Sequence, residues 1–248
     1  MNYEINQGDC LELMKNLPDH SVDMILADLP YGILSSEKWD QCLPLDQLWE
    51  QYKRLIKNNG CIALFGQEPF SSRLRLSNVE WYRYDWIWQK SQAGGAMLSH
   101  DRPLRSYETI SIFSLNKTAF HPPLESQDRF DEEQKFPKDI IYFSNRRKKS
   151  YHPTQKPVRL LEYLIQTYTE EGNTVLDNTM GSGSTGVAAL ATKRKFLGYE
   201  LERNFYQIAK KRIEDENKSD VPYLPPRLLD VDRIDNQQPK IPSWIENL

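Results

Sequence analysis

The sequence has little of what marks a secreted or membrane protein. No apolar run approaches the ~20 residues that a membrane span requires, and the first residues, MNYEINQGDC, have neither the basic start nor the apolar middle of a signal peptide. Three cysteines, Cys10, Cys42 and Cys61, are too few and too widely separated for a disulfide framework or a tetrahedral metal site. These absences predict a cytoplasmic protein with no membrane partner and no metal.

The sequence also lacks an excess of positive charge, since its formal net charge is -3. A nucleic-acid partner must therefore be inferred from local charge. The segment 144–159, SNRRKKSYHPTQKPVR, contains six basic residues and no acidic one. It predicts phosphate contacts from Arg146, Arg147, Lys148 and Lys149, with a solvated surface loop as the alternative.

Apolar periodicity alternates between strand-like and helix-like segments, which predicts an α/β fold with a mostly parallel, doubly wound sheet. Segments 83–91 and 106–114 are joined by a loop that contains Gly94 and Gly95, and they predict an antiparallel hairpin at the edge of this sheet. The predicted helices are 10–21, 45–60, 70–77, 158–170, 187–195 and 203–216, and the other predicted strands are 3–8, 22–28, 61–66, 174–179 and 196–201.

The stretch VDMILADLPYG, residues 22–32, is a candidate catalytic segment. Its apolar residues are typical of a strand covered on both faces, and the chemistry changes abruptly at Asp28. Because ligands of open α/β sheets bind beyond the carboxyl ends of the strands, Asp28 to Tyr31 are expected to lie at a ligand site.

A second candidate site is VLDNTMGSGSTGVAAL, residues 175–190. A strand ends at Asp177, Gly181 and Gly183 allow a tight turn, and a helix begins near Ser184. Glu200 ends the next strand about 20 residues on, where an acid can accept hydrogen bonds from ribose hydroxyls. The turn lacks both the full G-x-G-x-x-G spacing and the lysine of a phosphate loop, so a nucleoside cofactor without phosphates fits better than a dinucleotide. An ordinary strand-to-helix turn is the alternative.

Four motifs in this order carry a family resemblance: DLPY at 28–31, HPTQKP at 152–157, DNTMGSGST at 177–185 and GYEL at 198–201. The chain resembles the S-adenosylmethionine-dependent DNA amino-methyltransferases of the β class, whose order of motifs is circularly permuted. The resemblance runs from about Tyr3 to Glu214 and implies a Rossmann-like methyltransferase fold. The turn departs from the family's commoner DPFMGSGTT at Asn178, Thr179 and Ser184.

The resemblance implies methyl transfer to the N6 amine of adenine in double-stranded DNA, after the base has been flipped out of the helix. Asp28 and the carbonyl of Leu29 would accept hydrogen bonds from the amine, Pro30 would hold Leu29 extended, and Tyr31 would stack on the base. Lys156 would pair with the methionine carboxylate of the cofactor, and Asp9 and Cys10 would contact its adenine. The full set of cofactor-binding residues that the resemblance implies is Asp9, Cys10, Asp28, Lys156, Asp177, Met180, Gly181, Ser182, Gly183, Ser184, Thr185 and Glu200.

The resemblance also divides the chain. Residues 1–116 would form the catalytic half of one methyltransferase domain and residues 151–218 its cofactor-binding half. Residues 117–150, where the periodicity is lost, would be a target-recognition insertion, and residues 219–248 a proline-rich tail. The sequence leaves open the recognition sequence, a homodimer and a cognate restriction enzyme.

The sequence leaves other functions open. Relatives act on the cytosine N4 amine or on a protein glutamine, and Asp28 favours adenine over both. A nicotinamide-dependent oxidoreductase would share the glycine turn and the ribose acid but would leave DLPY and HPTQKP without a role. A non-catalytic nucleic-acid-binding protein is disfavoured by the intact DLPY segment.

Overall fold

The computed structural model describes residues 2–32, 41–96, 99–123, 137–146, 151 and 154–218. Its strands are β1 (Tyr3–Gln7), β2 (Val22–Ala27), β3 (Ile56–Gly66), β4 (Tyr82–Gly94), β5 (Arg105–Phe113), β6 (Ile140–Phe143), β7 (Thr174–Asp177) and β8 (Lys195–Glu200). Its helices are α1 (Cys10–Met14), α2 (Leu45–Leu55), α3 (Phe70–Ser77), α4 (Val158–Tyr168), α5 (Ser184–Ala191) and α6 (Arg203–Asn217). No helix within these ranges combines the length and hydrophobicity that crossing a bilayer would require.

The strands form one 8-stranded sheet in the order β1-β8-β7-β2-β3-β5-β4-β6. Among the described strands β5 alone runs against the others, pairing antiparallel with both β3 and β4. The predicted mostly parallel sheet is thus confirmed, and so is the antiparallel hairpin. The hairpin is not at the edge, however, because β6 pairs parallel with β4 and takes the edge position. β6 has only four residues, IIYF, too few to give a periodic signal.

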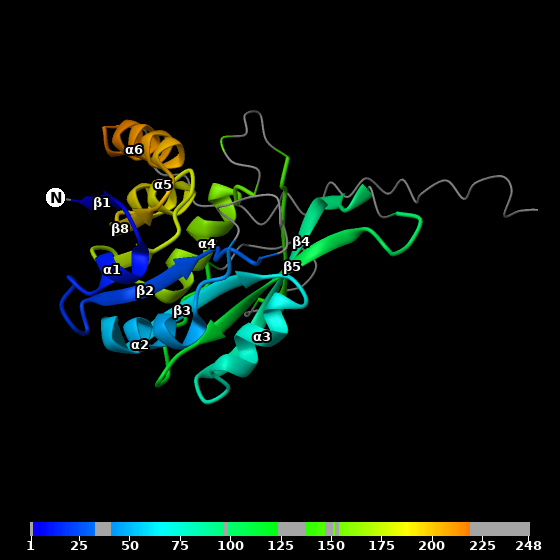
Figure 1. The fold of residues 1–248 in the computed structure, drawn as a ribbon, viewed down its shortest axis with the longest axis horizontal. Coiled ribbons are helices and arrows are strands. Elements are labelled where there is room, and N and C mark those ends of the chain that lie inside the picture. The colour runs from blue at the N-terminus through cyan, green and yellow to red at the C-terminus, as the bar shows by residue number, and fades with distance from the viewer. Residues whose placement is uncertain are drawn as a thin grey trace, which may run out of the picture.

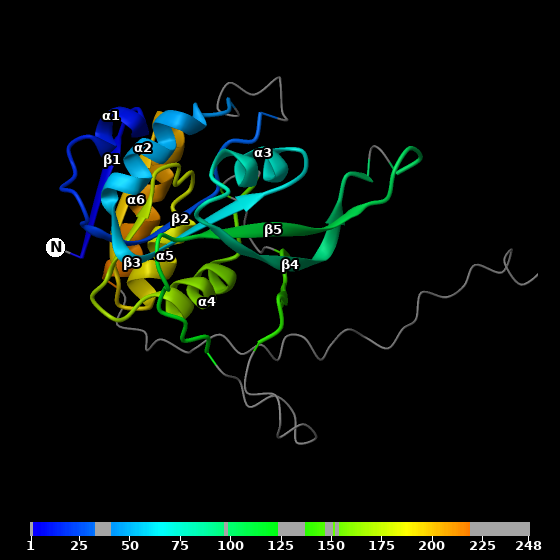
Figure 2. The same cartoon turned by 90° about the horizontal axis from the view of Figure 1, so that it is seen from below.

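Helices cover both faces of the sheet, which gives three layers (Figures 1 and 2). One face packs against α4, α5 and α6, and the other packs against α1, α2 and α3. In β2, Met24 and Leu26 face the first set of helices, whereas Ile25 and Ala27 face the second. The uninterrupted apolar run in the sequence therefore reflects a strand buried on both sides.

Several predicted boundaries were wrong. The helix predicted at 187–195 lies at Ser184–Ala191, and the ends of two other helices differ more. α2 ends at Leu55 instead of residue 60, because Ile56 is extended and pairs with Val22 of β2, so that the predicted helix stop lies within β3. α1 ends at Met14 instead of residue 21. Pro18 has no backbone N–H to donate to the carbonyl of Met14, so the helix cannot continue through it.

The order of the strands places the last part of the chain in the middle of the sheet. β7 pairs with β2 on one side and with β8 on the other. The crossover after β7 leads to β8, whereas the crossover after β2 leads to β3, so the chain departs in opposite directions from these two neighbouring strands. Such a reversal point is where open α/β sheets form a ligand crevice. Asp28 and Asp177 lie at the carboxyl ends of these two strands.

Candidate active site

A cavity of about 700 Å³ opens at the carboxyl ends of β2, β7 and β8. Both candidate sites contribute to its lining, as does the predicted cofactor lysine. Of the predicted catalytic and cofactor-binding residues, these line it: Asp9, Cys10, Asp28, Leu29, Pro30, Tyr31, Lys156, Asp177, Met180, Gly181, Ser182, Ser184, Thr185 and Glu200. Gly183 is not among the lining residues but forms the turn behind them.

Asp28 lies between a tyrosine and a lysine at one side of the cavity. Its Oδ1 accepts a 2.6 Å hydrogen bond from the Tyr31 hydroxyl, and its Oδ2 accepts a 2.5 Å bond from the Lys156 ammonium. Burial raises the pKa of Asp28; Lys156 opposes this effect, and the negative charge of Glu108 adds to it. Each carboxylate oxygen has two lone pairs, so Asp28 keeps capacity for a further donor.

Lys156 contacts two carboxylates. Besides Asp28, its ammonium lies 3.2 Å from Oε2 of Glu108, a residue of β5 that the sequence did not single out. Burial lowers the pKa of Lys156, but the two carboxylates outweigh it and hold the pKa above its usual range. The family resemblance predicts that Lys156 pairs with the methionine carboxylate of the cofactor. In the structure its ammonium is bound to Asp28 of the candidate catalytic segment.

Tyr31 stacks on Phe70 of α3, with 5.0 Å between ring centroids and an interplanar angle of 29°. The phenylalanine therefore holds the tyrosine ring in position beside Asp28. Stacking of Tyr31 on a target base stays a prediction.

The glycine-rich turn between β7 and α5 depends on positive backbone φ angles. Gly181 has φ 52° and Gly183 has φ 76°, and residues other than glycine rarely adopt such positive φ angles. A Cβ at Gly183 would lie 2.9 Å from the Cβ of Ala209 in α6, so the turn also packs directly against that helix. The backbone of the turn can approach a ligand closely because no side chain intervenes.

Two further carboxylates line the cavity near this turn. Oδ1 of Asp177 accepts a 3.1 Å bond from the amide of Thr179, and burial raises the pKa of Asp177 to about 7. Oε2 of Glu200 accepts from the amide of Gly181, and its Oε1 accepts from the amide of Glu202, each at 2.8 Å. Burial raises the pKa of Glu200 as well. Glu200 therefore ties the end of β8 to the glycine turn.

Comparison with known proteins agrees with this geometry. A model of a DNA methylase family, the N6/N4 type, matches residues 22–211. The type II methyltransferase M2.DpnII of Streptococcus pneumoniae is 31% identical over 243 residues, which cover 86% of this chain and 90% of that protein. This chain belongs to the N6/N4 DNA methylase family. The predicted family is thus confirmed, and the protein is a DNA methyltransferase.

Other similar proteins support the same assignment. The type II methyltransferase M.HinfI of Haemophilus influenzae is 27% identical over an alignment of 278 residues, covering 96% of this chain and 74% of that protein. The protein in the crystal structure of the M1.HpyAVI–SAM complex has 28% sequence identity to this chain. The two structures superpose with a TM-score of 0.66 over 85% of this chain and 98% of that chain. The PvuII cytosine-N4-specific DNA methyltransferase shares the fold, with a TM-score of 0.70 at 17% sequence identity. The match covers 88% of this chain and 89% of that chain.

Two of the methyltransferase's departures from the family's commoner turn, Asn178 and Thr179, have specific partners. Asn178 is buried; its Oδ1 accepts a 2.5 Å bond from the Tyr52 hydroxyl of α2, and its Nδ2 donates to Sγ of Cys10 at 3.5 Å. The Thr179 hydroxyl donates to the carbonyl of Asp28 at 3.3 Å. Cys10, predicted to contact the cofactor, thus also holds the turn, and burial raises its pKa to about 11.

Structural roles also fall on other residues of the site. Asp9 caps α1, its side chain accepting a 2.8 Å bond from the amide of Leu11. Arg212 of α6 donates to the carbonyl oxygen of Ser182 at 2.5 Å and to its hydroxyl at 3.1 Å. Arg212 was missed at the sequence level because nothing distinguishes it from the other basic residues of its helix.

The predicted DNA-contacting run begins at the rim of the cavity. Asn145 lines the cavity and is bonded through its side chain to Ser91 and Gln92 of β4. Arg146, the next residue, is exposed. Arg147, Lys148 and Lys149 lie outside the described residues, so contact of this run with DNA stays a prediction.

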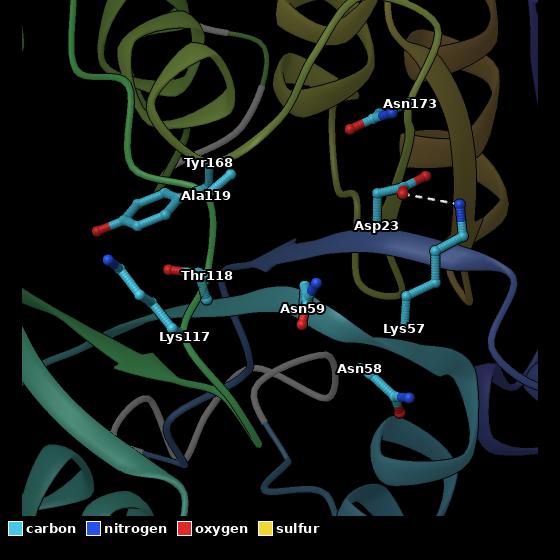
Figure 3. A pocket seen from close by; sticks show the side chains of 10 residues that line it. Asp23, Lys57, Asn58, Asn59, Lys117, Thr118, Ala119, Tyr168 and Asn173 are labelled. Carbon is cyan, nitrogen blue, oxygen red and sulfur yellow. Dashed lines mark hydrogen bonds and ion pairs between the residues drawn. The ribbon is translucent and has the colours of Figure 1, made fainter.

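A second hollow, of about 560 Å³, lies at the other end of the central strands, near the start of β2 (Figure 3). Lys57 and Asp23 line it and form a 2.7 Å ion pair, and Asp23 also accepts a 2.9 Å bond from the amide of Thr174. None of the four motifs contributes a residue to this hollow. It is not at the carboxyl ends of the strands, where open α/β sheets bind ligands.

Proposed function

We propose that this methyltransferase transfers a methyl group from S-adenosylmethionine to the N6 amine of adenine in double-stranded DNA. The observation that carries the proposal is that Asp28 of DLPY and the glycine turn with Asp177 and Glu200 line one cavity, although these segments are about 150 residues apart in the sequence. The complex of M1.HpyAVI with SAM supports the choice of cofactor, because that protein shares this fold at 28% identity.

The residues of the cavity fit this cofactor. Asp177 and Glu200 are buried carboxyls, and a sulfonium is a cation that such groups would favour. Gly181 and Gly183 leave the turn free of side chains that would fill the cradle. Met180 to Thr185 would lie along the cofactor, Glu200 would accept from its ribose hydroxyls, and Asp9 with Cys10 would contact its adenine.

When bound, the cofactor supplies an electrophilic methyl group. The chain's part is then to position the target amine and to direct its lone pair, which is otherwise delocalised into the base. Asp28 would accept one hydrogen bond from the amine and the Leu29 carbonyl the other. Pro30 favours an extended Leu29, and Tyr31, held by Phe70, would stack on the flipped base. Much of the rate would come from this positioning.

Lys156 has two candidate roles in this scheme. Its expected pairing with the methionine carboxylate requires the ammonium to reach toward the cofactor while it stays close to Asp28. Its observed contacts are with Asp28 and Glu108, and they support a second role, that of a cation that orients Asp28. A lysine with three donors can serve Asp28, Glu108 and a third acceptor together.

The DNA would lie across the mouth of the cavity, beside Arg146 and the basic run that follows. Residues 117–150 would supply base contacts as a target-recognition insertion between the two halves of the domain, 1–116 and 151–218. Because M.HinfI and M2.DpnII are named type II methyltransferases, we extend the proposal to protection of DNA against a cognate restriction enzyme.

Nucleoside analysis tests the proposal. Duplex DNA that lacks modified bases is incubated with the protein and isotopically labelled S-adenosylmethionine, digested to nucleosides and resolved by mass spectrometry. We expect label in N6-methyladenine. Label in N4-methylcytosine would move the assignment to the other amine of the family, and DNA without label would overturn the proposal.

A further inference from the structure

Four buried or partly buried charged side chains of alternating sign connect β4 with the catalytic segment. Lys90 Nζ lies 2.5 Å from Glu108 Oε1, Glu108 Oε2 lies 3.2 Å from Lys156 Nζ, and Lys156 Nζ lies 2.5 Å from Asp28 Oδ2. The side chains of Lys90, Glu108 and Lys156 are at most 10% exposed, and that of Asp28 is 22% exposed. Lys90 and Glu108 lie in β4 and β5, Asp28 follows β2, and Lys156 precedes α4, so the row forms only in the folded chain.

Glu108 is held in place within this row by hydrogen bonds from neighbouring side chains. Its Oε1 accepts from both Lys90 and the amide group of Gln67, the latter at 2.9 Å, and Gln67 in turn accepts from Arg105. Burial alone would raise the pKa of Glu108, but Lys156 and Lys90 hold it below its usual range, so the carboxylate is charged at neutral pH. Glu108 therefore presents a rigid negative charge to Lys156.

We propose that Glu108 is a positioning residue for methyl transfer, which keeps the Lys156 ammonium where it orients the Asp28 carboxylate toward the target amine. This inference rests on the proposed role of Asp28. Glu108 acts through Lys156 and need not touch either substrate.

The reason lies in what Lys156 would do without it. A lysine with a single buried carboxylate forms one tight pair, and the ammonium would then compete with the target amine for Asp28. With Glu108 on its other side, the ammonium is shared between two anions and its direction is fixed. Asp28 is then held by Lys156 on Oδ2 and by Tyr31 on Oδ1, and its remaining lone pairs point in defined directions.

The substitution that tests this role is Glu108→Gln, which keeps the shape and one acceptor but removes the charge. The full-length protein is assayed with duplex DNA and S-adenosylmethionine. We expect kcat to fall about 10- to 100-fold, the range for a misplaced catalytic group. The dissociation constants for cofactor and DNA should stay within about threefold, because Glu108 is assigned no contact with either.

The pH profile separates positioning from simple damage to the fold. Two charged groups contact Glu108 directly, namely Lys90 and Lys156. Asp28 is connected to Glu108 through Lys156, and Arg105 is connected to it through Gln67. The charge of Glu108 raises the pKa of Asp28 and of Lys156. Removing the charge should lower both pKa values. The two limbs of the plot of kcat against pH that Asp28 and Lys156 control should therefore move to lower pH.

Two further variants complete the experiment. Lys90→Gln removes a positive charge from the same row and should move the limbs in the opposite direction. Asp23→Asn is the matched control, because it removes the carboxylate partner of Lys57 at the far end of the strands and should leave kcat and both limbs unchanged.

Each outcome decides the matter. An unchanged kcat in Glu108→Gln, or a reduced kcat with unmoved limbs, would overturn the positioning role. Should Glu108→Gln fail to fold, as judged by its melting curve, the Lys90→Gln profile decides, and unmoved limbs there count against the proposal. Wild-type protein that leaves DNA unmethylated would refute the proposed function instead, so the two failures are distinguishable.

Discussion

Asp177 offers a quantitative test of the electrostatics of the cavity. It is 3% exposed, at the end of β7, and burial raises its pKa from 3.8 to about 7. A carboxyl whose pKa is higher in the folded state than in the unfolded state destabilises the fold once the pH rises above the unfolded value. Asp177→Asn removes this titration while retaining one acceptor oxygen, so we expect the variant to gain stability as the pH rises.

The magnitude follows from the two pKa values. With 3.8 unfolded and about 7 folded, ionisation of Asp177 costs about 4 kcal/mol of unfolding free energy at pH 8 and about 1 kcal/mol at pH 4.5. The asparagine loses one acceptor, because Asp177 is bonded to both Thr179 and Thr185, and this loss costs about 1 to 2 kcal/mol at every pH. The variant should therefore be more stable than wild type by about 2 to 3 kcal/mol at pH 8 and no more stable than wild type at pH 4.5.

Urea unfolding of both proteins without cofactor, at several pH values from 4.5 to 8.5, measures this difference. Taking the difference between variant and wild type cancels the titration of acids that do not interact with Asp177, including Glu108, whose lowered pKa acts with the opposite sign. Asp28 and Glu200 interact with Asp177 and add a change that is smaller than the effect of burial. A difference in unfolding free energy that stays constant across the range would refute the reasoning, since Asp177 would then have an ordinary pKa.

The other predictions concern binding and catalysis. Asp28→Ala should reduce methyl transfer by about 100-fold or more, because an amine acceptor in a dry site is lost, and calorimetry should show cofactor affinity within a few fold of wild type. Glu200→Ala should weaken S-adenosylmethionine binding by about 1.5 to 3 kcal/mol in calorimetry, with DNA affinity little changed; equal cofactor affinity would remove Glu200 from the site. Gly183→Ala should lower the melting temperature and the cofactor affinity together, because φ is 76° and α6 leaves no room for the methyl group; an unchanged melting curve would contradict the packing. Replacing Arg146, Arg147, Lys148 and Lys149 with alanine should reduce the slope of log affinity against log salt by roughly 2 for specific and random duplexes alike, whereas parallel lines would mean that the run does not contact DNA.

The sequence was sufficient for those parts of the site that lie at the ends of strands. Apolar runs locate buried strands, and the carboxyl ends of parallel strands meet at one edge of a sheet. The residues at these ends, Asp28, Asp177 and Glu200, could therefore be expected together, and the structure places all three around one cavity. The order of the motifs supplied the rest, because it matches a family with a known arrangement.

The contacts that hold these residues could not be predicted in the same way. Glu108 lies within a strand whose alternation is explained by packing, and its partners Lys90 and Lys156 come from other elements. Arg212 reaches the glycine turn from α6, 30 residues away in sequence. Such pairs depend on register and on which helix face meets a loop, and neither is encoded in local periodicity.

Asn178 and Thr179 show how a departure from the commoner turn is accommodated. Asn178 has an acceptor and a donor, and Tyr52 and Cys10 supply one partner for each, so a polar side chain is buried without an unpaired group. Thr179 donates to the carbonyl of Asp28 and thereby links the cofactor-side turn to the catalytic segment across the β2–β7 boundary. This bond joins segments about 150 residues apart in the sequence, so we expect a displacement of the turn to shift the backbone of Asp28. The position of Asp28, the proposed catalytic residue, therefore depends on Lys156 and Glu108 on one side and on the glycine turn on the other.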